Sequence, residues 1–79
     1  MVNAQQYLDE KYSRKEKRKE LCLNIANKNL EGHLDLSGFI NLEALNCASN
    51  QITSIDLRNN KKLIVIDCSY NKIEVLRYQ

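Results

Sequence analysis

Three cysteines and one histidine are the side chains of this sequence best suited to chemistry. Cys47 and Cys68 occupy the same place in two related octapeptides, LNCASNQI and IDCSYNKI, which begin 21 residues apart. Paired cysteines can close a disulfide or bind a metal ion. Neither CxxC nor HExxH is present, and the chain has no GxSxG or phosphate-binding glycine motif. The surrounding repeat must therefore decide what the cysteines do.

The repeat consists of apolar pairs with one spacer residue between the two members. From Leu21 onward the pairs recur every 10 or 11 residues, as Leu23/Ile25, Leu34/Leu36, Leu45/Cys47, Ile55/Leu57, Ile66/Cys68 and Leu76/Tyr78. Alternation of this kind predicts strands with one buried face. Two pairs make a period of 21 to 22 residues, and a period in this range predicts stacked coils.

Residues 42–52 and 63–73 both fit the pattern LxxLxLxxNxL, with cysteine in the third apolar slot and isoleucine in some of the others. This stretch resembles the leucine-rich repeat family in a short form, and the resemblance implies an α/β fold, a solenoid of two to three coils with parallel strands. The segments AQQYLDEKY and NLEGHLDLSGFINLEALNC more specifically resemble a large fungal set of small cytoplasmic leucine-rich repeat proteins, some of which stand beside a kinase-like domain. That resemblance implies a module for interaction or regulation and brings no catalytic residues with it.

The two cysteines take an apolar slot of the repeat, so we interpret them as small packing residues that point into the coil and stack. A disulfide between Cys47 and Cys68 is the alternative, because strands about 4.8 Å apart bring them close, but in-register side chains on parallel strands give it poor geometry. A metal ion would need further inward ligands, and the neighbouring slots are aliphatic. We expect Asn50 and Asn71 to form a structural ladder that satisfies backbone groups inside the bend.

The chain divides into two parts. We expect residues 1–20 to form an N-terminal helical cap and charged linker, with Asn3 as the helix N-cap, and residues 21–79 to form the solenoid, whose last coil is incomplete. In the segment SRKEKRKE, Glu16 and Glu20 interrupt the basic residues and no aromatic residue accompanies them. This pattern favours a solvated segment over a site for nucleic acid or anionic lipid, so nucleic acid is not an expected partner.

The composition limits the class of protein. Apolar residues make up 43% of the chain and charged residues 28%, with a net charge of +2, as in an ordinary folded domain. No apolar run approaches the roughly 18 residues of a membrane helix, and the N-terminus lacks the apolar stretch of a signal peptide, so we expect a cytoplasmic protein without membrane contact. His33 is the one natural base and is expected to face solvent. The sequence therefore predicts a protein that is not an enzyme and uses no cofactor or metal.

Function is expected on surface columns formed by equivalent positions of successive coils. The candidate partner-binding residues are Ala44, Asn46, Val65, Asp67 and Tyr70. Strands on the inner curve of a solenoid present such columns as a binding face for a protein. Tyr70 is the expected anchor, since aromatic residues are enriched at binding hot spots. The alternative is that Tyr70 only ends its column and has a structural role.

The last coil predicts a second surface. Ile66, Cys68, Ile73 and Leu76 would leave their flank and their unpaired strand edges in water. Pairing of these edges about a two-fold axis would bury them, so self-association into a homodimer is expected. The alternative function is an N-terminal capping fragment of a longer leucine-rich repeat protein, such as a kinase-linked regulator, with no partner of its own.

Overall fold

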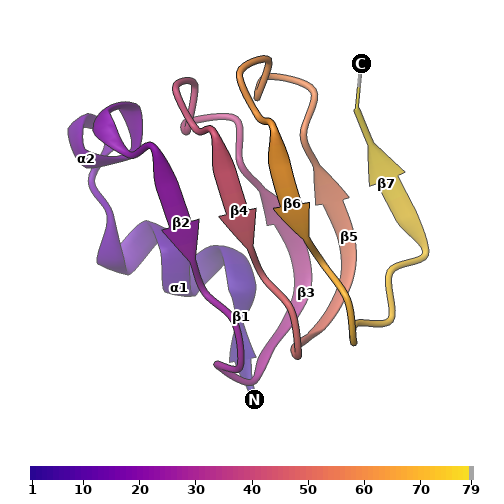
Figure 1. Cartoon of the computed structure of the whole chain (residues 1–79). Helices are drawn as coiled ribbons and strands as arrows, with labels where there is room; N and C mark the ends of the chain where they lie inside the picture. The colour runs from indigo at the N-terminus through magenta and orange to yellow at the C-terminus, as the bar shows by residue number, and fades with distance from the viewer. Residues whose placement is uncertain (79) are drawn as a thin grey trace.

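Two parallel sheets form the two sides of the molecule (Figure 1). The computed structural model describes residues 1–78. The front sheet has the order β2 (Cys22–Asn24), β4 (Ala44–Asn46) and β6 (Val65–Asp67). The back sheet has the order β1 (Val2–Asn3), β3 (Leu30–Asp35), β5 (Gln51–Asp56) and β7 (Val75–Arg77). From β2 onward the chain alternates between the sheets, so that each strand pairs with the strand two places later in the sequence.

Successive coils stack in register. The inward residues pair in two rows, Leu23–Leu45–Ile66 in the front sheet and Leu34–Ile55–Leu76 in the back sheet. Each of these residues belongs to one of the apolar pairs of the repeat, which places it on the buried face of its strand. The predicted α/β solenoid of stacked parallel strands is therefore confirmed.

The core lies between the two sheets and extends under the first helix. Its largest fully buried side chains include Leu8, Leu23, Ile25, Leu34, Leu36, Phe39, Leu45, Ile52 and Ile55. Burying a side chain of this size stabilises a fold by about 1.5–3 kcal/mol before the cost of lost conformational entropy. The apolar pairs thus supply the main stabilising term of a small domain.

Asparagine side chains satisfy the backbone inside the bends. The Asn50 amide nitrogen donates to the carbonyls of Ile25 and Cys47, at 3.0 Å each, and its side-chain oxygen accepts from the backbone N–H of Lys28 and Leu30. One coil later, Asn71 donates to the Cys47 carbonyl at 2.9 Å. Each of these asparagines therefore links its own coil to the coil before it.

The helix α1 (Ala4–Lys11) covers the first coil. Asn3 caps it, because its side-chain oxygen accepts from the Gln6 backbone N–H at 2.9 Å. Ala4 and Leu8 are one helical turn apart and both are fully buried, so a single face of the helix meets the core. The predicted N-terminal helix packs on the first strands as expected.

The basic segment forms a second, separate helix, α2 (Arg14–Lys19), rather than an extension of the first. Ser13 and Glu16 make a capping box: the Ser13 hydroxyl accepts from the Glu16 N–H, and the Glu16 carboxylate accepts from the Ser13 N–H. Lys17 connects the helices through an ion pair with Asp9, at 2.6 Å. Within residues 1–78, neither helix has the length and apolar character that a membrane crossing requires.

The back sheet begins with a strand that the apolar pairs did not predict. β1 pairs with β3, and the Val2 backbone N–H donates to the Asn29 carbonyl at 3.1 Å. The register of β3 against β5 shifts between Gly32 and His33, where Gly32 has a φ of +89°. A φ in this range suits glycine, which has no side chain to clash there. Across this shift, Thr53 of β5 is the residue left without a partner in β3.

Candidate protein-binding face

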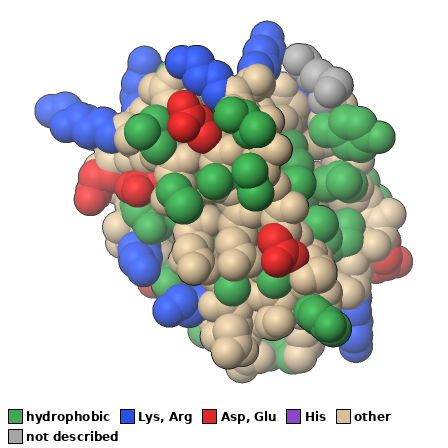
Figure 2. Space-filling view, in the orientation of Figure 1, with side chains coloured by type: hydrophobic (Ala, Val, Ile, Leu, Met, Phe, Trp, Pro, Cys, Tyr) green, Lys and Arg blue, Asp and Glu red, His purple; other side chains and the backbone are tan. Residues whose placement is uncertain are grey.

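The outward side of the front sheet is a mixed apolar and polar surface. Cys22, Ala44 and Val65 pair in register and form its central row. Leu21 and Ile64 continue the apolar area, with 54% and 81% of their surface exposed. Figure 2 shows hydrophobic side chains gathered over these strands, with acidic side chains among them. We call this surface, with the polar row and Tyr70 described next, the strand face.

A polar row ends each strand of the strand face. The side-chain oxygens of Asn24 and Asn46 accept from the backbone N–H two residues later, each at 3.1 Å, and Asp67 does the same with Ser69 at 3.0 Å. This Asx geometry turns the chain out of the strand. It occupies the oxygens but leaves the amide nitrogens of Asn24 and Asn46 as donors at the surface, without a partner among residues 1–78.

The Asp67 carboxylate is the acceptor of the strand face. Hydrogen bonds from the Ser69 hydroxyl and backbone N–H lower the pKa of Asp67, so the group is charged at neutral pH. Neither ion pair found within residues 1–78 includes it. The strand face therefore offers a polar row, in which two amide donors are followed by a carboxylate, and an apolar row that runs beside it.

The next column holds residues in the left-handed backbone region. Asn27, Ser49 and Tyr70 stand at equivalent places with φ values of 56°, 59° and 56°. Asparagine tolerates this conformation, whereas a bulky aromatic residue in it is uncommon. Tyr70 is also 84% exposed, so packing does not hold its ring there. Strained residues of this kind cluster at functional sites.

The two cysteines of the repeat, Cys47 and Cys68, pack in or against the core. Cys47 is fully buried, Cys68 is half-buried, and Cys22 is exposed; all three are free thiols. Burial raises the pKa of the Cys47 thiol to about 12, and the neighbouring Cys68 and Asp67 act in the same direction. A thiol that remains protonated at neutral pH is a poor nucleophile and a poor metal ligand. Residues 1–78 contain no cluster of three metal-ligating side chains.

His33 makes a contact that the repeat pattern did not reveal. It pairs with Ser54 in the back sheet, and its Nδ1 is hydrogen-bonded to the Ser54 hydroxyl. The pair is exposed on the sheet opposite the strand face, and within the described chain no carboxylate orients the imidazole. A nucleophilic serine requires an oriented base and a site for the developing oxyanion. The arrangement serves as a surface hydrogen bond.

The last coil exposes the residues expected at its flank. Relative exposure rises from 0% at Leu23 and 2% at Leu45 to 40% at Ile66 in the front sheet, while Leu76 reaches 42% in the back sheet. Cys68 and Ile73 are half-buried beside them. These residues lie along β6 and β7, the outer strands of the two sheets, so each sheet has an open edge there (Figure 1).

Three surface or buried features were missed by the sequence analysis. Leu21 and Ile64 extend the apolar row, and aligning the residue before each strand would have shown them. Asn60 is a buried asparagine, 6% exposed, which donates to the carbonyls of Leu36 and Phe39. When the turns 36–42 and 57–63 are aligned, Asn60 stands at the position of Phe39. A polar residue in a slot that is aromatic one coil earlier was the sequence feature that could have indicated a buried, hydrogen-bonded asparagine.

Comparison with known proteins agrees with this geometry. The family described as leucine rich repeats, in two copies, matches residues 40–78. No curated protein and no solved structure matches the chain. The matched segment runs from the turn before β4 to the end of β7, and it contains β4 and β6 of the front sheet and β5 and β7 of the back sheet.

Proposed function

We propose that the chain, whose residues 40–78 belong to the leucine-rich repeat family, is a non-catalytic module that binds a protein through the strand face. Leucine-rich repeat domains are generally protein-binding, and stacked strands offer an extended surface for this purpose. The single observation that carries the proposal is Tyr70, an 84% exposed aromatic ring held at a φ of 56° in the column next to the polar row.

The chemistry of the strand face describes the partner. An apolar side chain fits over Ile64 and Val65, which expose 81% and 60% of their surface. A basic group of the partner complements the unpaired Asp67 carboxylate, and backbone carbonyls of the partner accept from the amides of Asn24 and Asn46. An extended segment that crosses the strands along the polar row meets Asn24, Asn46 and Asp67 in this order, with the apolar row beside it.

Two substitutions test the strand face while preserving the turn. Tyr70→Asn removes the ring and places in the left-handed region a residue that tolerates it. Asp67→Asn removes the charge and keeps an oxygen for the Ser69 N–H. Glu31→Gln is the matched control, because Glu31 is exposed on the back sheet.

The assay is affinity capture on the immobilised chain, followed by a direct titration of each captured protein. We expect binding to weaken at least ten-fold in Tyr70→Asn and in Asp67→Asn, as for anchor residues that contribute more than about 1.4 kcal/mol. Glu31→Gln should bind as the unaltered chain does. Equal binding by all four proteins would remove the strand face as the site.

The open edges of β6 and β7 support a second proposal, self-association. In β6, the Val65 N–H and the Asp67 carbonyl are both bonded toward β4. Alternate residues of a parallel strand face opposite neighbours, so the backbone groups of Ile66 face the open side. A second copy that pairs there would cover Ile66, Cys68, Ile73 and Leu76.

Light scattering coupled to size exclusion tests self-association over a wide concentration range. We expect the mass of a dimer at high concentration and a shift toward the monomer in Leu76→Lys, which places a charge on the edge. The control is Val65→Lys, which changes the strand face instead. A folded monomer at all concentrations would contradict self-association and leave the strand face as the binding surface, whereas an unfolded or aggregated chain would favour the alternative of a fragment of a longer repeat protein.

A further inference from the structure

Two turns that lead from the back sheet to the front sheet have the same backbone hydrogen bonds. In residues 36–42, the Phe39 N–H donates to the Leu36 carbonyl at 3.0 Å, and the Leu42 N–H donates to the Phe39 carbonyl at 3.2 Å. In residues 57–63, Asn60 N–H donates to Leu57 at 3.1 Å and Leu63 N–H donates to Asn60 at 3.2 Å. The two turns therefore present their carbonyls in the same way.

The first turn shows which group fits against such carbonyls. The Asn60 side-chain nitrogen donates to the Leu36 carbonyl and to the Phe39 carbonyl, at 2.9 Å each. Each carbonyl thus accepts one backbone N–H and one carboxamide N–H, which uses both of its lone pairs. A neutral side-chain amide is the natural complement of this turn.

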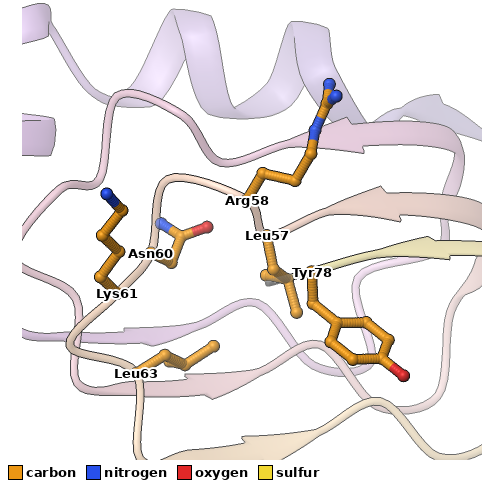
Figure 3. A pocket seen from close by; sticks show the side chains of 6 residues that line it. All are labelled: Leu57, Arg58, Asn60, Lys61, Leu63 and Tyr78. Atoms are coloured by element: carbon orange, nitrogen blue, oxygen red, sulfur yellow. The ribbon is translucent and has the colours of Figure 1, made fainter.

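In the second turn the corresponding places are open. The carbonyls of Leu57 and Asn60 each accept one backbone N–H and no side-chain donor among residues 1–78. The Asn60 side-chain oxygen is buried and also has no partner there. The residues form a hollow of about 200 Å³, the flank hollow, lined by Leu57, Arg58, Asn60, Lys61, Leu63 and Tyr78 (Figure 3).

We propose that the flank hollow binds a side-chain carboxamide, carried by a partner segment with the pattern Leu-x-x-Asn-x-x-Leu that adds a coil beside β6 and β7. The inference deepens the edge proposal: it rests on a polypeptide adding to those strands, and it names the group that this polypeptide contributes at the turn. Leu57, Leu63 and Tyr78 provide the apolar walls that receive the partner's leucines (Figure 3).

Charge selects a neutral donor for the flank hollow. The carbonyl oxygens of Leu57 and Asn60 repel a carboxylate, which has no proton to donate. Lys61, which forms no ion pair within residues 1–78, repels an ammonium or guanidinium group at the hollow, while Arg58 is paired with Asp56. A primary amide has two N–H donors and no net charge, and it occupies the same kind of site one coil earlier.

The first test titrates the full chain, at a concentration where light scattering shows the monomer, with a synthetic peptide copying residues 57–78 with Cys68→Ser. The control peptide also carries Asn60→Leu, which keeps the size but removes the amide. By NMR we expect saturable shifts at Leu57, Asn60 and Leu63 of the protein, and about 10- to 100-fold weaker binding of the control peptide. Equal affinity of the two peptides would overturn the carboxamide site while leaving the edge proposal intact.

A second test does not depend on a peptide adopting a coil. Propionamide is a free carboxamide, and propionate is a carboxylate of the same size. We expect propionamide, and not propionate, to shift the backbone signals of Asn60 and Leu63 in the full chain. Shifts of equal size with both compounds, or no saturable shift with either propionamide or the peptides, would overturn the proposal.

Discussion

Replacing Asn50 by alanine should be among the most damaging single changes in this chain. Its side-chain nitrogen contacts the carbonyls of Ile25, Cys47 and Ala48, and its oxygen accepts from the N–H groups of Lys28 and Leu30. Asn50 is 7% exposed, so water does not replace these bonds freely. A buried polar group that loses its hydrogen-bond partner lowers the free energy of unfolding by about 1–3 kcal/mol.

We expect Asn50→Ala to lower the free energy of unfolding by about 2–4 kcal/mol, because several backbone groups lose their partner and some relax toward solvent. A domain of this size has a total free energy of unfolding of about 4–12 kcal/mol. The corresponding fall in melting temperature is roughly 10–25 °C. Urea unfolding followed by circular dichroism, with unchanged m-value as the test of two-state behaviour, measures the difference.

Two further alanine substitutions make the comparison decisive. Asn71 is half-buried at the open edge, so Asn71→Ala should cost less, about 1–2 kcal/mol. Asn24 is exposed and its side chain accepts one backbone N–H, so Asn24→Ala should cost about 0.5 kcal/mol. If Asn50→Ala cost no more than Asn24→Ala, the ladder would not be a significant source of stability and the reasoning would be refuted.

Three other outcomes follow from particular side chains. Gly32→Ala should destabilise the fold by about 1–2 kcal/mol in urea unfolding because of the φ of +89°, whereas Gly38→Ala should cost less, since the nearest atoms belong to a flexible lysine side chain. The thiol of Cys47 has its pKa raised to about 12 in the folded chain, so the unfolded chain loses this proton more readily; stability should fall between about pH 9 and pH 12, and the fall should be shallower in Cys47→Ala. Hydrogen bonds from the side chain and backbone of Arg58 lower the pKa of Asp56 to about 2; an NMR titration should find this value, and Arg58→Ala should move it back toward the ordinary range, while an unchanged value would show that the pair does not form in solution.

The strands and their stacking were predictable because the same apolar pattern occurs twice in the sequence. The pattern from Leu42 to Ile52 recurs from Leu63 to Ile73, and alternation fixes which side chains face inward. Register follows from the period, because equivalent residues of successive coils must lie beside each other. The same logic placed Asn50 and Asn71 at the bends, where the structure gives them backbone partners.

The remaining features depend on contacts that have no period. β1 is two residues long and pairs with a strand distant in the sequence. It is too short to show the alternation of apolar and polar residues that predicts a strand. The capping box of Ser13 and Glu16 was a local signal for a separate helix, and the run of basic residues concealed it. The left-handed backbone at Tyr70 was not expected from the sequence, because a bulky aromatic residue rarely adopts it.

The covering of one flank by α1 and β1 has a consequence for the order in which the chain acquires structure. Local stability should decline from the first coil, where Leu8 and Leu23 are fully buried, toward the last, where Ile66 and Leu76 are 40% and 42% exposed. Amide exchange should therefore be slowest near β2 and β3 and fastest near β7. Since the ribosome delivers the N-terminal residues first, the covered end can fold during synthesis and serve as the template on which each later coil is laid.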